Sequence, residues 1–220
     1  MATKPAPINA ALPNPVLRAD AQRNRDRILV AAAEAFATTG PDTSVEEIAC
    51  AAGVAVGTLY RRFPDRQALI RGVALMNFAK TVAEVKLAAK EESTGWDALV
   101  RIFGQSQHLR LAMRFALELP TARRVLEGDP EAAVLKRQMI AVFDEVVRKA
   151  QAEGSVRTDI GSGDVAVAFV FLARQIPAPH IESAPLATQR ILALMLDAFR
   201  ASPVEPLPGR PLTPADLGLD

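Results

Sequence analysis

The sequence has little of several features that define common protein classes. Among its 220 residues there is one cysteine, Cys50, so an internal disulfide framework is excluded and a reducing compartment is indicated. Aromatic residues make up 5% of the chain while alanine is abundant, which favours closely packed helices over sheets. The 26 basic and 25 acidic residues almost cancel, leaving a formal net charge of +1. Nucleic-acid binding would therefore have to rest on a local arrangement of residues.

Long apolar runs are also missing. The longest, at residues 165–173, is roughly half of what a membrane-spanning helix needs. The N-terminal segment is interrupted by several prolines and lacks the continuous apolar stretch of a secretory signal. The two histidines, His108 and His180, form no metal-binding spacing, and nothing local indicates a cofactor. These absences predict a soluble, cytoplasmic protein without a membrane partner, a metal or a cofactor.

Helical periodicity dominates the middle of the chain. Between residues 18 and 201, apolar residues recur at helical spacing, with neither hairpin turns nor alternating strand patterns. The predicted fold class is all-α, with roughly nine or ten helices. Two units are indicated, one of three short helices at residues 18–65 and a larger helical one at residues 66–201. The proline-rich ends predict a flexible arm at residues 1–17 and a disordered tail at residues 202–220.

Residues 43–63 form a compact helix-turn-helix pattern. Two capping-box pairs can start its first helix, Thr43 with Glu46 or Ser44 with Glu47. Gly53 ends that helix at the place in the turn that needs a positive φ, and a second short helix follows. In DNA-binding proteins of this pattern the second helix lies in the major groove. Helix, glycine and helix also follow one another in many other all-α proteins, so the geometry alone leaves the function open.

The second helix of this unit presents a face suited to DNA. Its apolar residues lock it against the first helix, while the remaining face carries small, hydroxyl, aromatic and cationic groups, which can approach base edges and phosphates. The residues of this face are Val56, Gly57, Thr58, Tyr60, Arg61 and Arg62. Since Val56 and Gly57 have no hydrogen-bonding side chain, base recognition would rest on few contacts and on DNA shape.

The segment at residues 48–69, IACAAGVAVGTLYRRFPDRQAL, resembles the signature of the tetracycline-repressor-like (TetR) family of transcriptional regulators. The preceding residues 27–29 (RIL), Phe36 and Gly40 are similar to the first helix of that family, and the similarity covers residues 25–73. It implies an N-terminal helix-turn-helix DNA-binding domain, followed by a larger helical domain that binds an effector and forms a dimer.

The resemblance also implies roles for individual residues. Thr43 or Ser44, at the start of the second helix, would bind a phosphate. The residues that would face base edges, at the start of the recognition helix, are Val56, Gly57 and Thr58. The residues at further contact positions, mainly to the DNA backbone, are Tyr60, Arg61, Arg62 and Arg66.

Two positions depart from the family pattern. Ala55 stands where a serine is common, so the recognition helix lacks a side-chain cap. Arg62 stands where a histidine is common, so the affinity of this contact would depend more on charge. Several arginines before and within the first helix either steer the arm along DNA or form a solvated face. They are Arg18, Arg23, Arg25 and Arg27.

The rest of the chain holds candidates for two further sites. A helix at residues 165–173 is apolar on every face and must be covered on every face. It either forms the centre of the larger domain or, as the resemblance implies, joins the last helix in a homodimer interface, through residues 164–176 and 185–201. The resemblance places a small apolar or amphipathic effector among the middle helices, at residues 66–153. Candidate lining residues, for each of which ordinary core packing is the alternative, are Phe103, His108, Met113 and Phe143.

The favoured hypothesis is a ligand-responsive transcriptional repressor that binds palindromic double-stranded operator DNA as a homodimer and is released by a small-molecule effector. The alternative is a helical small-molecule-binding protein whose DNA-binding unit has degenerated, as the uncapped Ala55 would suggest. An enzyme is not expected, because we recognise no acid–base pair, phosphate loop, nucleophile elbow or metal cluster. The arginine- and alanine-rich composition indicates a bacterium with a GC-rich genome.

Overall fold

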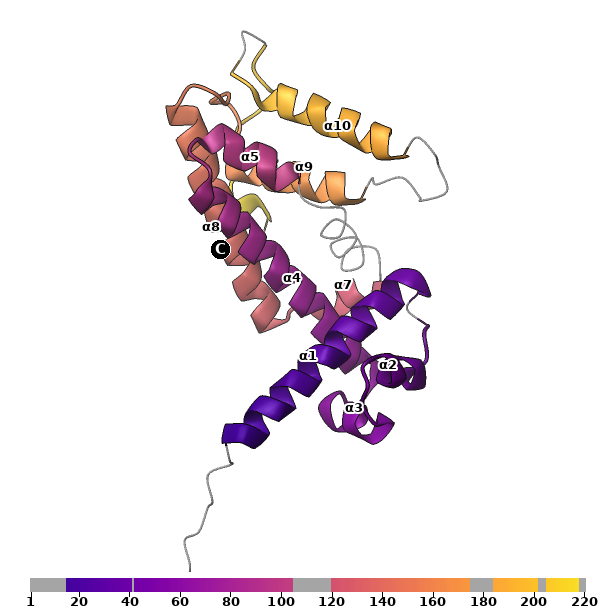
Figure 1. Ribbon diagram of the computed structural model, residues 1–220. Coiled ribbons are helices and arrows are strands. Elements are labelled where there is room, and N and C mark those ends of the chain that lie inside the picture. Colours follow the sequence, from indigo (N-terminus) through magenta and orange to yellow (C-terminus); the bar gives the residue numbers. More distant parts are fainter. Residues whose placement is uncertain (1–14, 41, 105–119, 175–183, 202–204, 218–220) are drawn as a thin grey trace, which may run out of the picture.

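The structure, a computed structural model, describes residues 15–40, 42–104, 120–174, 184–201 and 205–217. Within these ranges the predicted all-α class is confirmed, and strand-like pairing is limited to one antiparallel bridge between Val156 and Arg200. In chain order the helices (Figure 1) are α1 (Pro15–Thr38), α2 (Val45–Ala51), α3 (Val56–Arg62), α4 (Arg66–Glu91), α5 (Gly95–Phe103), α7 (Pro120–Leu126), α8 (Pro130–Ala152), α9 (Ser162–Arg174), α10 (Ala184–Phe199) and the short 3-10 helix η1 (Ala215–Leu217).

A first hydrophobic core holds the three N-terminal helices against the start of α4. In Figure 1, α1 crosses α4 diagonally, and α2 and α3 lie at the end of the molecule away from α10. The cluster includes Ile28 and Leu29 of α1, Ile48 of α2, Leu59 of α3 and Val73 of α4, each at most 1% exposed. Burying a side chain of this size stabilises the fold by roughly 1.5–3 kcal/mol. Helix α3, which has only seven residues, is therefore held in place by tertiary packing.

A second core lies between the later part of α4 and helices α5, α8, α9 and α10. Phenylalanine rings meet edge to face at its centre. The ring centroid of Phe103 lies 5.5 Å from that of Phe169 and 5.6 Å from that of Phe199. The ring centroids of Phe143 and Phe169 are 5.5 Å apart. Val85 of α4 is fully buried in the same cluster. Helix α4 therefore contributes to both cores and connects them as one uninterrupted helix.

The structure differs from the sequence-based expectation at both ends of the chain. Helix α1 begins at Pro15, inside the predicted flexible arm, because proline suits a first helical position. In the structure, residues 205–217 of the predicted disordered tail instead bond to the connection between α8 and α9 and to the first turn of α9. A proline-rich composition predicts disorder only where no tertiary partner receives the segment.

An ion pair fastens the start of α8 to the start of α4. Asp129 is 8% exposed and caps α8 by accepting from the amides of Glu131 at 2.9 Å and Ala132 at 3.0 Å. Arg71 Nε donates to the other carboxylate oxygen at 2.5 Å. Burial raises the pKa of Asp129, but the bonds from Arg71 and the two amides outweigh it, so the pKa lies below its ordinary value. The fold therefore stabilises the ionised carboxylate.

We expect Asp129→Asn to lower the free energy of unfolding at pH 7 by about 1–3 kcal/mol, because it removes the ion pair and keeps a capping side chain. Since the folded-state pKa of Asp129 is depressed, this contribution is present above the unfolded-state pKa of about 4 and is lost as the pH falls through the folded-state pKa. Urea unfolding at pH 7, and in steps below about pH 4, measures both effects.

The control for this experiment is Arg123→Gln, which breaks an exposed pair with Glu127. It should change the free energy of unfolding by less than about 0.5 kcal/mol. Equal stability of wild type and Asp129→Asn at pH 7 would contradict the role given to the ion pair.

Candidate nucleic-acid interface

Helix α2 starts on the second of the two predicted capping boxes. The Ser44 hydroxyl oxygen accepts from the Glu47 amide at 3.1 Å, and the Glu47 carboxylate accepts from the Ser44 amide at 3.2 Å. Thr43 is 6% exposed, and its hydroxyl donates to the Gly40 carbonyl at 2.8 Å. Of the two residues predicted to bind a phosphate, the half-buried Ser44 is therefore the more exposed, while the Thr43 hydroxyl points inward.

The turn between α2 and α3 depends on Gly53 and on Arg27 of α1. Gly53 has a φ of +61°, as its position in the turn predicts. Arg27 Nη2 donates to the carbonyls of Ala52 at 2.6 Å and Gly53 at 2.9 Å, and a Cβ at Gly53 would lie 2.5 Å from that nitrogen. This guanidinium thus satisfies carbonyls that the end of α2 leaves without helical partners. The sequence marks Arg27 only as a member of a basic cluster, because its bond to the Ala52 carbonyl spans 25 positions and has no local signal.

Helix α3 begins without a side-chain cap, as predicted. Ala55 has extended dihedral angles (φ −68°, ψ 143°), and no side-chain bond caps the helix. The helix is instead held by Leu59, 1% exposed, and by Phe63, which follows its last turn and is 4% exposed. The Arg25 guanidinium lies 5.9 Å from the centroid of the Phe63 ring, so a second arginine of α1 contacts this unit.

The predicted contact face of α3 lies at the surface. Gly57, Tyr60, Arg61 and Arg62 are exposed, and Val56 and Thr58 are half-buried. Arg61 Nη2 donates to Thr58 Oγ1 at 2.9 Å, which aligns the two side chains along the helix. Nothing lies within 4 Å of a Cβ built on Gly57, so the backbone there is open to a close approach. The structure thus brings the six predicted residues of α3 together on one short helix.

Arg66 lies at the first position of α4 and ties two elements together. Its Nη1 donates to the Thr43 carbonyl at 2.9 Å, and its guanidinium lies 5.9 Å from the Phe36 ring centroid. It therefore positions the start of α2 beside the start of α4. The chain carries no acidic residue from 48 to 64, so the arginines of α3 give this face a positive charge within a nearly neutral protein.

The predicted effector-site residues fall into two groups. Phe103 and Phe143 are each 1% exposed, and both contact the Phe169 ring within the second core. His108 and Met113 lie outside the described residues. In the described part of the chain, no three histidine, cysteine or acidic side chains are grouped so as to hold a metal ion. Among the described helices, none is both long and apolar enough to cross a membrane.

The fold and its exposed, turn-fixed second helix define a helix-turn-helix DNA-binding protein. A sequence model described as "Bacterial regulatory proteins, tetR family" matches residues 28–73. A TetR transcriptional regulator from Streptomyces coelicolor (SCO0520) is 30% identical, with 80% of this chain and 98% of that chain covered and a TM-score of 0.63. The chain belongs to the TetR family of bacterial transcriptional regulators.

Two further comparisons agree with this assignment. A TetR transcription regulatory protein from Mycobacterium vanbaalenii is 30% identical, with 84% of this chain and 99% of that chain covered and a TM-score of 0.54. The HTH-type transcriptional regulator UidR of Escherichia coli K12 is 27% identical over 150 residues, which are 66% of this chain and 76% of UidR. The similarity thus extends well beyond the helix-turn-helix unit.

The two glycines of this interface should respond in opposite ways to the same substitution. Gly53→Ala should lower the free energy of unfolding by about 1–2 kcal/mol, because it combines a positive φ with a clash against Arg27. Gly57→Ala should raise it by up to about 1 kcal/mol, because the new methyl enters open space in a helix. Thermal unfolding of both variants measures the contrast. A stable Gly53→Ala variant would show that the turn is not constrained as described.

Proposed function

We propose that the protein is a ligand-responsive repressor that binds palindromic operator DNA as a homodimer and leaves it when a small apolar or amphipathic molecule binds the larger domain. The single observation that carries the proposal is the face of α3, where Thr58, Tyr60, Arg61 and Arg62 lie together on a helix fixed by the Gly53 turn. A short helix held this way can enter the major groove without rearranging. We place the protein in the bacterial cytoplasm, where such DNA is found.

The proposed DNA contacts divide by chemistry. Val56, Gly57 and Thr58 face base edges, and the bare Gly57 backbone allows the helix to lie close to them. Ser44 donates its hydroxyl proton to a phosphate, since its oxygen already accepts from the Glu47 amide. The DNA backbone is contacted by the outward-facing side chains of Tyr60, Arg61 and Arg62. Arg66 contributes mainly by holding the start of α2, and the inward Thr43 hydroxyl contributes indirectly.

The proposed dimer uses α9 and α10. Four large apolar side chains on these helices are strongly exposed, namely Phe171 at 57%, Leu186 at 59%, Ile191 at 44% and Leu194 at 67%. We take this group of large exposed apolar side chains to mark an interaction surface. Because a helix-turn-helix dimer reads two half-sites, covering these residues with a second copy also supplies the symmetry that a palindrome requires.

The proposed response to an effector runs through α4. An effector that enters the second core beside Phe103 and Phe143 has to displace rings that contact one another, and α4 forms part of the same core. The start of α4 lies in the first core and is tied to α8 by the Arg71–Asp129 pair. A ligand with a few kcal/mol of preference for one position of α4 therefore changes operator occupancy tenfold or more.

Binding-site selection from random duplex DNA with the full-length protein tests the proposed function. The expected product is a palindrome, bound as a dimer with an affinity that falls steeply as salt rises. The uncapped start of α3 at Ala55 is the observation that favours the alternative, a helical small-molecule-binding protein that no longer binds DNA. Failure to enrich any sequence, together with salt-independent behaviour, would favour that alternative.

Replacing one backbone contact should weaken binding without changing sequence preference. Arg62→Gln should lower the affinity for the selected palindrome about three- to tenfold and reduce the salt slope by about one unit per protomer, because each arginine neutralises one phosphate. The control is Arg148→Gln, which breaks an exposed pair with Asp144 on α8, far from α3 in sequence. Fluorescence anisotropy titrations at several salt concentrations give both quantities. An unchanged salt slope for Arg62→Gln would remove this residue from the interface.

A charge on the proposed dimer face should separate the protomers. Leu194→Glu should turn the dimer into a monomer at micromolar concentration, because a carboxylate buried there costs several kcal/mol. Since Leu194 is 67% exposed within one chain, the fold of the protomer should be unaffected. Leu87→Glu, at an exposed leucine of α4, is the matched control and should leave the dimer intact. Sedimentation equilibrium distinguishes the two. A dimeric Leu194→Glu variant would place the interface elsewhere.

A further inference from the structure

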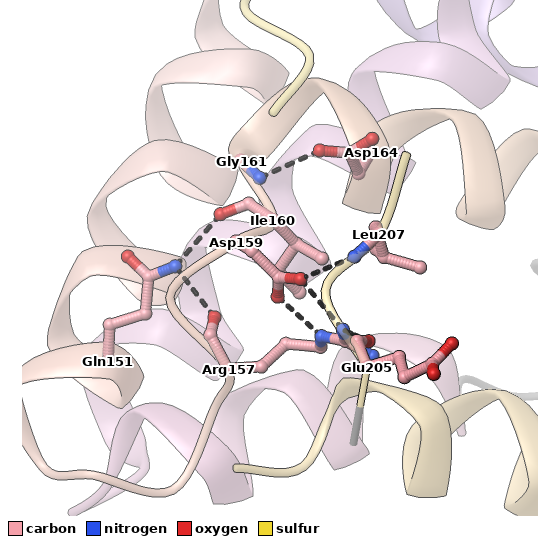
Figure 2. Close-up of polar contacts among 8 residues, drawn as sticks. All are labelled: Gln151, Arg157, Asp159, Ile160, Gly161, Asp164, Glu205 and Leu207. Carbon is pink, nitrogen blue, oxygen red and sulfur yellow. Dashed lines mark hydrogen bonds and ion pairs between the residues drawn. The ribbon is translucent and has the colours of Figure 1, made fainter. Parts of the chain in front are cut away.

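Residues 205–217, which we call the strap, follow α10 and return to the loop between α8 and α9 (residues 153–161). Figure 2 shows Glu205 and Leu207 of the strap facing Arg157 and Asp159 of that loop. Arg157 Nη2 donates to the Glu205 carbonyl at 3.2 Å, and the Leu207 amide donates to Asp159 Oδ2 at 2.9 Å. The loop therefore holds the strap by its main chain.

The loop at residues 153–161 is itself held in place by a side chain of α8. Gln151 Nε2 donates to the carbonyls of Arg157 at 3.0 Å and Ile160 at 2.8 Å, as Figure 2 shows. Arg157 and Asp159 are joined by two bonds, at 2.5 Å and 2.7 Å. The hydrogen bond from Arg157 holds the pKa of Asp159 below its ordinary value, and the Leu207 amide lowers it further. The loop thus presents a fixed, ionised acceptor to the strap.

The first turn of α9 is built to let the strap approach closely. Asp164 Oδ2 accepts from the amides of Gly161 at 2.8 Å and Leu212 at 3.0 Å, and the Gly163 amide donates to the Leu212 carbonyl at 3.1 Å. A Cβ at Gly161 or Gly163 would lie 2.5 Å or 2.6 Å from that carbonyl oxygen. Neither glycine has a positive φ, so the nearness of the strap is the reason for the missing side chains.

The end of the strap is ordered by its own contacts. Arg210 pairs with Asp216 through two bonds of 2.7 Å and 2.6 Å, and the Thr213 amide donates to Asp216 at 2.8 Å. Leu217 then packs against the second hydrophobic core. Ion pairing, backbone bonds and apolar packing together explain why this proline-rich segment is structured.

Helix α10 is anchored mainly at the end from which the strap departs. Leu196 and Phe199 are each 8% exposed, whereas Leu186, Ile191 and Leu194 are strongly exposed. At this end of the helix, the Arg157 amide donates to the Phe199 carbonyl at 3.0 Å, and the neighbouring residues form the Val156–Arg200 bridge. Arg157 therefore holds the end of α10 with its amide and the strap with its side chain.

We propose that the strap fixes the angle of α10 relative to α9 and thereby sets the half-site spacing that the dimer accepts. The proposal rests on the dimer described under the proposed function. The 16 residues of α10 span about 24 Å, so a tilt of roughly 10° at its anchored end moves the other end by on the order of 4 Å. That displacement is close to the ~3.4 Å rise of one base pair. A displacement of this size at the dimer face is large enough to move one recognition helix by one base pair.

Two full-length variants release the strap by different means. Gly163→Ala drives a methyl into the Leu212 carbonyl, and Asp159→Ala removes the acceptor of the Leu207 amide. Arg148→Gln, on α8 but without a bond to the strap, is the control. Hydrogen exchange of strap peptides verifies the release, and circular dichroism verifies that the helices remain. The affinity of each protein is then measured for a palindrome obtained by binding-site selection. It is measured at the selected half-site spacing and with the half-sites one base pair closer together or farther apart.

Wild type and Arg148→Gln should prefer the selected spacing by roughly tenfold or more. Both strap variants should remain helical and dimeric and keep their affinity for a single half-site. Their affinity at the selected spacing should exceed that at the altered spacings by less than about threefold. Faster exchange of the strap with an unchanged spacing preference would overturn the proposal, as would unchanged exchange in both variants. If the unmodified protein is monomeric or selects no palindrome, the proposed function itself has failed, a result seen without any variant.

Discussion

The packing of α4 between two hydrophobic cores is the constraint on which the remaining structure depends. A Cβ at Gly72 would lie 2.8 Å from Leu29 and 2.9 Å from Phe63, so α1 and the end of α3 pack tightly on this turn of α4. The adjacent Arg71 bonds to Asp129 at the start of α8. One turn of α4 thus contacts the DNA-binding unit and the larger domain together. Since close-packed interiors move as rigid bodies, a displacement of α4 has to carry the recognition helix with it.

The DNA-binding unit gains its rigidity from its hydrophobic core and from arginine side chains that bond to backbone carbonyls, rather than from helix length. Isolated helices as short as α2 and α3 are unstable in water, and α3 has no side-chain cap. Arg27 from α1 supplies the bond that the turn at Gly53 needs, and Arg66 supplies the bond to Thr43. Arg27 and Arg66 therefore help to shape this surface through bonds within the protein, while Arg61 and Arg62 of α3 remain exposed.

Features that depend on neighbouring residues could be predicted from the sequence. The capping box at Ser44, the positive φ at Gly53 and the uncapped Ala55 are all found as predicted. Each follows from residues within a few positions, where the donors and acceptors of the first or last helical turn must be satisfied locally. The choice between Thr43 and Ser44 needed the structure, because both fit the spacing. Only the structure shows that Ser44 caps α2, whereas the Thr43 hydroxyl is buried and donates to the Gly40 carbonyl.

The sequence by itself determined the all-α class, the helix-turn-helix unit and its exposed α3 face, because periodicity and capping act over short distances. Only the tertiary structure decided which carbonyls Arg27 holds, that Phe103 and Phe143 share one aromatic cluster, and that residues 205–217 are ordered. The bonds of the strap join residues 48 positions apart. No local pattern encodes such a contact, since its partner is set by how the helices pack.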